Sequence, residues 1–213
     1  MNGTPRRRLP QFLLLAFAAI FVALGIAPAM REDWLLENVL VVVAVVWLVR
    51  SRHSLALSNP ACVALFVLGV LHEIGAHWQY SEVPYDAWFA ALSGVSLDAV
   101  FGFERNQYDR LVHFLYGVLV TPAAVELIEA RVRPRGVWRV LVPLTFMMSH
   151  ALVYELFEWF AAALFGGDLG IAYLGSQGDV WDAQKDMALA VLGSVLVLPF
   201  LLWRQRRQQR AGG

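Results

Sequence analysis

The chain has 213 residues, of which 59% are hydrophobic and 16% are charged. Soluble domains are about 45–50% apolar and about 25% charged, so this composition indicates a membrane protein. The 17 basic and 17 acidic residues cancel to zero net charge, which gives no long-range field for nucleic acid and excludes it as an expected partner. The single cysteine, Cys62, excludes a disulfide framework and a cysteine-based metal site within one chain.

Six apolar stretches are long enough to cross a bilayer, whose hydrocarbon core of about 30 Å needs about 20 residues of helix. The sequence therefore predicts one all-α domain, residues 1–213, folded as a polytopic bundle of six transmembrane helices. The predicted spans are residues 12–30, 34–49, 59–80, 108–130, 137–165 and 180–203. Residues 81–107 are predicted to form an outer loop with a short surface helix over 85–100, in preference to a seventh span. Residues 204–213 form a basic cytoplasmic tail.

The basic residues predict the orientation of these spans in the membrane. With six spans, 13 of the 17 Lys and Arg residues fall on the side that holds both termini, which is therefore predicted to be cytoplasmic. The start of the chain has a second interpretation, because Arg6–Arg8, an apolar run and Ala27-Pro-Ala29 also fit a cleavable signal peptide. Removal of residues 1–29 would leave five spans.

Ionisable side chains at membrane depth cost about 2.5–3.5 kcal/mol each on insertion scales, so each one predicts a function. Four of the six spans carry groups of such residues, and nearly all of these are predicted to lie in the outer half of the membrane. They are His72, Glu73 and His77 in the third span; Asp109, Arg110 and His113 in the fourth; His150, Glu155 and Glu158 in the fifth; and Asp179, Asp182, Lys185 and Asp186, with the polar but uncharged Gln184 among them, at the start of the sixth.

Helical spacing groups these residues by face. Glu73 and His77 are four residues apart, as are Asp109 and His113, and Glu155 and Glu158 are three apart. The group at 179, 182 and 186 follows the same step and forms an acidic stripe. His72 and His77 lie about 140° apart around a straight helix, so we expect only one of them to face a common centre.

Imidazoles and carboxylates that converge in this way are the ligands of a divalent metal ion, which is the candidate cofactor. We expect acid–base chemistry from Asp109, His113, Glu155 and Glu158, and metal binding from His72, Glu73, His77, Asp179, Asp182 and Asp186. Arg110, Gln184 and Lys185 are candidates for binding an anionic head group. The same residue types also suit a proton relay. Asp109, Asp179 and Asp182 also suit plain helix capping at positive helix N-termini.

Four motifs resemble the YjdF-like family of bacterial inner-membrane proteins. They are residues 72–80 (HEIGAHWQY), 105–114 (RNQYDRLVHF), 155–159 (ELFEW) and 175–187 (GSQGDVWDAQKDM). This resemblance implies a multi-pass protein of the inner membrane and indicates the positions of the family signature, but no particular activity. A weaker resemblance is to VanZ-like membrane proteins: Asp109-Arg110 with His113-Phe114 fits the first element of their pattern, whereas Ala190 stands where Asn is expected.

Three functional hypotheses follow. The first is a membrane-embedded enzyme or binding protein that acts on a lipid or lipid-linked substrate from the outer leaflet, with a divalent metal ion. The second is a small proton-coupled transporter, which would need a polar route through the inner halves of the spans, where Glu126 and Glu129 are almost the only charged residues. The third is a structural or accessory membrane protein whose polar residues form a satisfied core network.

Overall fold

The computed structural model describes residues 8–211, and within that range the protein consists of helices joined by short connections, without β-strands. The helices are α1 (Arg8–Leu24), α2 (Arg31–Leu55), α3 (Asn59–Trp78), the 3₁₀ helix η2 (Tyr80–Glu82), α4 (Tyr85–Ser93), α5 (Leu97–Phe101), α6 (Tyr108–Arg131), α7 (Trp138–Phe165), α8 (Gly167–Leu174) and α9 (Asp182–Ala211). The predicted all-α class is confirmed.

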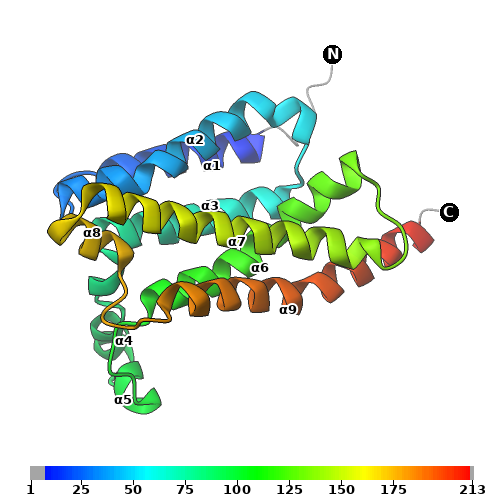
Figure 1. Ribbon diagram of the computed structural model, residues 1–213. Coiled ribbons are helices and arrows are strands. Elements are labelled where there is room, and N and C mark those ends of the chain that lie inside the picture. The colour runs from blue at the N-terminus through cyan, green and yellow to red at the C-terminus, as the bar shows by residue number, and fades with distance from the viewer. Residues whose placement is uncertain (1–7, 212–213) are drawn as a thin grey trace.

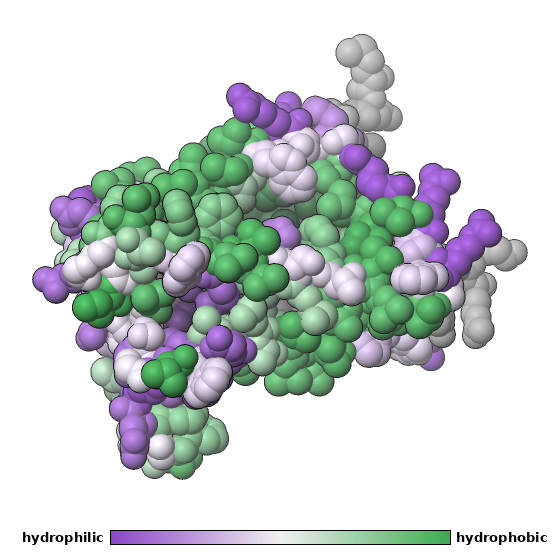
Figure 2. Space-filling view, in the orientation of Figure 1, coloured by the Kyte–Doolittle hydropathy of each residue, from purple (hydrophilic) through white to green (hydrophobic). Residues whose placement is uncertain are grey.

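Within residues 8–211, five helices are long and apolar enough to span a bilayer: α2, α3, α6, α7 and α9. Six spans were predicted, and the helix that differs is α1, which has only 17 residues. Side chains that face outward from the spanning helices are mostly apolar, for example Val43, Phe160 and Leu196. In Figure 2 the hydrophobic colour covers the flank of the bundle and the hydrophilic colour gathers mostly toward its two ends, which is the distribution that a lipid environment requires.

Two helices extend beyond their predicted spans. α2 begins at Arg31 instead of residue 34 and continues to Leu55, so that Asp33 becomes part of its first turn, where the helix dipole favours an acid. α9 continues through the residues predicted as a basic tail, as far as Ala211.

The long helices pack in a continuous series around α6. This helix contacts α3 on one side and α9 on the other, α1 packs against α3, and α7 packs against α9. The closest seam is between α6 and α9, where a Cβ atom on Gly117 would collide with the carbonyl of Ala190 and one on Gly193 with the carbonyl of Phe114. The absence of a side chain at these two glycines therefore allows α6 and α9 to approach closely.

The two ends of the bundle differ in composition (Figure 1). At one end, here called the basic end, α1 starts, α2 leads into α3, α6 leads into α7 and α9 finishes; its basic residues include Arg50, Arg52, Arg131, Arg133, Arg135 and Arg139. At the opposite end, here called the extension end, α4 and α5 project away from the bundle, and α8 joins α7 to α9.

Residues 81–107, predicted as an outer loop with one short helix, contain two short helices, α4 and α5, and η2 (Tyr80–Glu82) lies at the start of this segment. Side-chain hydrogen bonds hold this extension together: the Tyr85 hydroxyl donates to Asp98 (2.6 Å) and the Ser96 hydroxyl donates to Asp86 (2.9 Å). Asn106 then fastens the extension to the bundle, because its side chain donates to the Val83 carbonyl (2.9 Å) and accepts from the Tyr108 amide (2.9 Å).

Candidate metal centre

Asp109, His113 and Asp186 form the centre of the candidate site. Each offers one ligand atom, and the three atoms lie within 4.8 Å of one another. Asp109 and His113 are one turn apart on α6, and the close α6–α9 seam brings Asp186 to them. The side chains of Asp109 and His113 are only 13% and 11% exposed, and Asp186 is buried. Two carboxylates and an imidazole in this arrangement are suited to a divalent metal ion.

Glu155 adds a third carboxylate from α7. Its Oε1 lies 3.8 Å from Nε2 of His113, and Oδ1 of Asp109 lies 3.4 Å from the same nitrogen. Both Glu155 Oε1 and Asp186 Oδ1 are buried without a hydrogen-bond partner among residues 8–211. Buried carboxylates without partners are costly. A cation bound between them would remove that cost.

Glu158 and Tyr154 complete the α7 side of the site. Glu158 follows Glu155 by one turn and is half-buried, with Glu155 and Asp109 among its charged neighbours. The Tyr154 ring meets the His113 ring edge-on, with centroids 5.7 Å apart. The four residues predicted to act as acid–base groups, Asp109, His113, Glu155 and Glu158, are therefore brought together.

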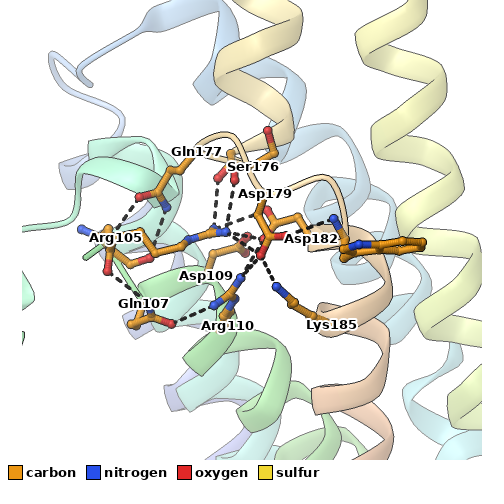
Figure 3. Close-up of polar contacts among 12 residues, drawn as sticks. Arg105, Gln107, Asp109, Arg110, Ser176, Gln177, Asp179, Asp182 and Lys185 are labelled. Atoms are coloured by element: carbon orange, nitrogen blue, oxygen red, sulfur yellow. Dashed lines mark hydrogen bonds and ion pairs between the residues drawn. The ribbon is translucent and has the colours of Figure 1, made fainter. Parts of the chain in front are cut away.

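The remaining acidic residues of α9 and of the connection before it pair with cations instead of joining this centre (Figure 3). Asp182 accepts a hydrogen bond from Arg105 (2.6 Å), and Asp179 binds Arg110 and Lys185. The hydrogen bond from Lys185, followed by that from the Trp181 amide, lowers the pKa of Asp179 to about 2. Asp179 and Asp182, predicted as metal ligands, thus form an ion-pair network one helical turn beyond Asp186.

The three predicted ligands on α3 lie outside the central group. Nδ1 of His72 is hydrogen-bonded to the Tyr80 hydroxyl (2.6 Å), whose ring packs against Gly75. Nδ1 of His77 contacts the Leu24 carbonyl (2.7 Å) at the end of α1. Glu73 is fully buried, and neither of its carboxylate oxygens has a hydrogen-bond partner within the described chain.

Sequence reasoning missed several polar residues near the site. Asp33, Glu37 and Asn38 on α2 are all buried, and the Tyr154 hydroxyl approaches Glu37 at 3.5 Å. The spacing of Asp33 and Glu37, four residues apart, was a detectable signal, but the predicted span began after Asp33. Arg105 was also missed as a site residue, although its guanidinium reaches Asp182 and the Ser176 carbonyl. Gln184, a predicted substrate-binding residue, is exposed near the network.

Polar side chains of α6 at the basic end have partners. The Ser58 amide donates to Glu126 (2.8 Å), the Ser58 hydroxyl donates to the same carboxylate, and Arg139 pairs with Glu129 (2.8 Å). Nearer the middle of the bundle, His150 is exposed and its Nδ1 contacts the Tyr116 hydroxyl (2.8 Å).

Long apolar helices with a polar interior define a polytopic helical membrane protein, and comparison with known proteins agrees. Residues 9–207 match the family described as predicted membrane protein (DUF2238), and the chain belongs to this family. It is similar to the inner membrane protein YjdF of Escherichia coli (strain K12), with 29% identity over 200 residues that cover 93% of this chain and 91% of that protein. The YjdF-like resemblance is thereby confirmed, whereas the VanZ-like one gains no support. No solved structure matches.

Proposed function

We propose that this protein is a membrane-embedded, metal-dependent enzyme that acts on a lipid or lipid-linked substrate from the outer leaflet. The observation that carries the proposal is the convergence of Asp109, His113 and Asp186, with ligand atoms within 4.8 Å, beside the unpartnered Glu155 oxygen. Placing several acids and an imidazole at membrane depth is unfavourable in free energy, so such a group favours a functional role. Its position toward the extension end favours a substrate that approaches from that side.

The residues have distinct roles in this proposal. Asp109, His113 and Asp186 hold the metal ion, and Glu155, next to His113, is the further candidate ligand or proton acceptor. Glu158, half-buried and one turn further along α7, is the second acid–base group. A bound divalent ion supplies Lewis acidity and lowers the pKa of coordinated water.

The topology proposed with this function has six spans and two cytoplasmic termini. α1 counts as the sixth span because its 17 residues reach about 25 Å and it packs closely on α3, where the Phe17 ring lies against Gly69. The start of α1 and the end of α9 lie at the same end of the bundle (Figure 1). That end carries most of the arginines, which favours the cytoplasmic side.

A proton-coupled transporter is the competing assignment, since buried carboxylates on several helices also suit proton transfer. Transport needs groups that can change partners along the whole path. Toward the basic end, Glu126 and Glu129 are already engaged by Ser58 and Arg139. Substrate-dependent proton flux in reconstituted vesicles would favour the transporter.

The direct test is metal analysis of the purified full-length protein by inductively coupled plasma mass spectrometry. We expect about one divalent ion per chain, and at least about a tenfold loss of affinity in His113→Ala and Asp186→Asn. His53→Ala is the matched control, because His53 is exposed near the end of α2. Absence of bound metal in the wild-type protein, together with an unchanged lipid profile in a deletion strain, would contradict the proposal.

A further inference from the structure

Three cationic side chains converge on one carboxylate at the extension end (Figure 3). Oδ2 of Asp179 pairs with Nη2 of Arg110 and Nζ of Lys185, and Nη1 of Arg105 lies 3.5 Å away. A carboxylate oxygen normally neutralises one such group. Convergence of three cations on a single oxygen is the arrangement that a phosphate, with more oxygens and more charge, satisfies better.

The charges of this network do not balance. The second acid, Asp182, is engaged by Arg105 at 2.6 Å and by Arg110 at 3.4 Å. Three cations therefore share two carboxylates. In addition, the Nε atoms of Arg105 and Arg110 are buried without a hydrogen-bond acceptor in the described part of the chain. Among these five side chains alone, the surplus is one positive charge, and the two Nε donors have no acceptor.

Asp179 lies on a connection between helices, whereas two of the three cations, Arg110 and Lys185, are anchored on helices. The connection between α8 and α9 has positive φ angles at Gly175, Gln177 and Gly178. Arg110 belongs to α6 and Lys185 to α9. The Lys185 side chain is 50% exposed, so the network is open to solvent on that side. Displacement of Asp179 requires movement of a short connection, whereas Arg110 and Lys185 would stay on their helices.

The network adjoins the proposed metal centre. Arg110 follows Asp109 directly, and Asp182 precedes Asp186 by one helical turn, about 6 Å along α9. A group bound by the three cations would therefore lie next to the metal ligands.

We infer that Arg105, Arg110 and Lys185 form a binding site for a phosphate group, and that Asp179 occupies this site until the phosphate displaces it. The assignment of the phosphate as part of a substrate rests on the proposed function, but its binding does not. The chemistry fits both a phospholipid head group and free phosphate. Asp179 then acts as an internal competitor, which lowers the affinity of the site for anions.

The test uses full-length protein in phosphate-free maltoside detergent micelles, treated with EDTA to remove metal and then dialysed to remove the EDTA. Inorganic phosphate is titrated by isothermal calorimetry, and retention of phosphatidic acid is measured by native mass spectrometry. We expect Asp179→Asn to bind phosphate at least about tenfold more tightly than wild type, because the competitor is neutralised. Arg105→Gln in the Asp179→Asn background should abolish the gain. Asp168→Asn is the matched control, since Asp168 is an exposed acid in the first turn of α8.

The outcomes separate the ligand sources and the two proposals. Tighter binding of both probes identifies the phosphate group itself as the ligand, and tighter binding of phosphatidic acid alone identifies a phospholipid. A folded Asp179→Asn variant with unchanged affinity, or an equal gain in Asp168→Asn, would overturn the inference. If Asp179→Asn does not fold, Lys185→Gln should weaken wild-type binding about fivefold, and unchanged binding would count against the site. Because the titration is done without metal, its result does not depend on the metal analysis. A protein that is purified without bound metal but shows this binding pattern would contradict only the proposed function.

Discussion

The two ends of this bundle differ in whether their buried or half-buried glutamate and aspartate side chains have hydrogen-bond partners. At the basic end, Glu126 accepts two hydrogen bonds from Ser58, and Glu129 pairs with Arg139. Toward the extension end, Glu73, Glu155 and Asp186 are buried with oxygens that lack partners among residues 8–211. Folding alone favours satisfied polar groups, so the unpartnered oxygens of the second set are the feature that the proposed metal binding would account for.

The α6–α9 seam connects these two regions, and its disruption should have the largest effect. Gly193→Leu places a side chain against the Phe114 carbonyl, which is backbone and cannot move aside alone. Overpacking typically lowers the free energy of unfolding by about 1–3 kcal/mol, and we expect a loss at the upper end of that range or above it. Thermal unfolding in detergent measures this loss of stability. Ala188→Leu, at an exposed position of α9, should have little effect. Equal destabilisation by both variants would show that the close contact between α6 and α9 is no more sensitive to a larger side chain than the surface of α9.

Neutralising one glutamate at each end should change stability in opposite directions. Glu126→Gln cannot accept both Ser58 hydrogen bonds in the same way, and we expect a loss of about 1–3 kcal/mol. Glu155→Gln removes one of three carboxylates around His113, and we expect a gain of about 1 kcal/mol in metal-free protein, because an unsatisfied buried charge disappears.

Thermal unfolding of EDTA-treated protein measures both changes, and added metal supplies the control. Wild-type protein should gain stability with metal, because the ion binds only the folded state, whereas Glu155→Gln should gain less. Destabilisation of the metal-free protein by Glu155→Gln would instead favour the hypothesis that these residues form a structural network.

The long helices and part of the candidate site were predictable from sequence. Hydropathy located the helices, and the i, i+4 spacing of Asp109 and His113 put these two residues on one face. What sequence could not supply was the partner of each polar group. His77 shares a face with Glu73, yet it bonds to the Leu24 carbonyl, a group left free by the end of α1. Asp179 had the spacing of a ligand with Asp182 and Asp186, but the connection after α8 brings it to three cations.

The residues of α2 were missed for a different reason. A hydropathy criterion places the start of a span where the apolar run begins, so Asp33 was left outside the second span. Glu37 lay inside it, but without Asp33 it was a lone acid with no partner four residues away. In the folded protein that helix begins at Arg31, and both Asp33 and Glu37 are buried. Buried acids at the start of an apolar helix are therefore the residues that a hydropathy criterion misses most easily.

The smallest expected effect is the pH dependence of the stability that Asp179 contributes to the cationic network. The pKa of Asp179 is lowered to about 2, chiefly by the hydrogen bond from Lys185. A lowered folded-state pKa gives stability that is fully present above the usual carboxyl pKa of about 4 and is lost as pH falls toward 2. The difference in unfolding temperature between wild type and Asp179→Asn should therefore stay constant from about pH 5 to pH 8 and shrink below about pH 4. A difference that varies between pH 5 and 8 would mean that Asp179 is not held ionised by its cations, and the internal competitor would then be absent at neutral pH.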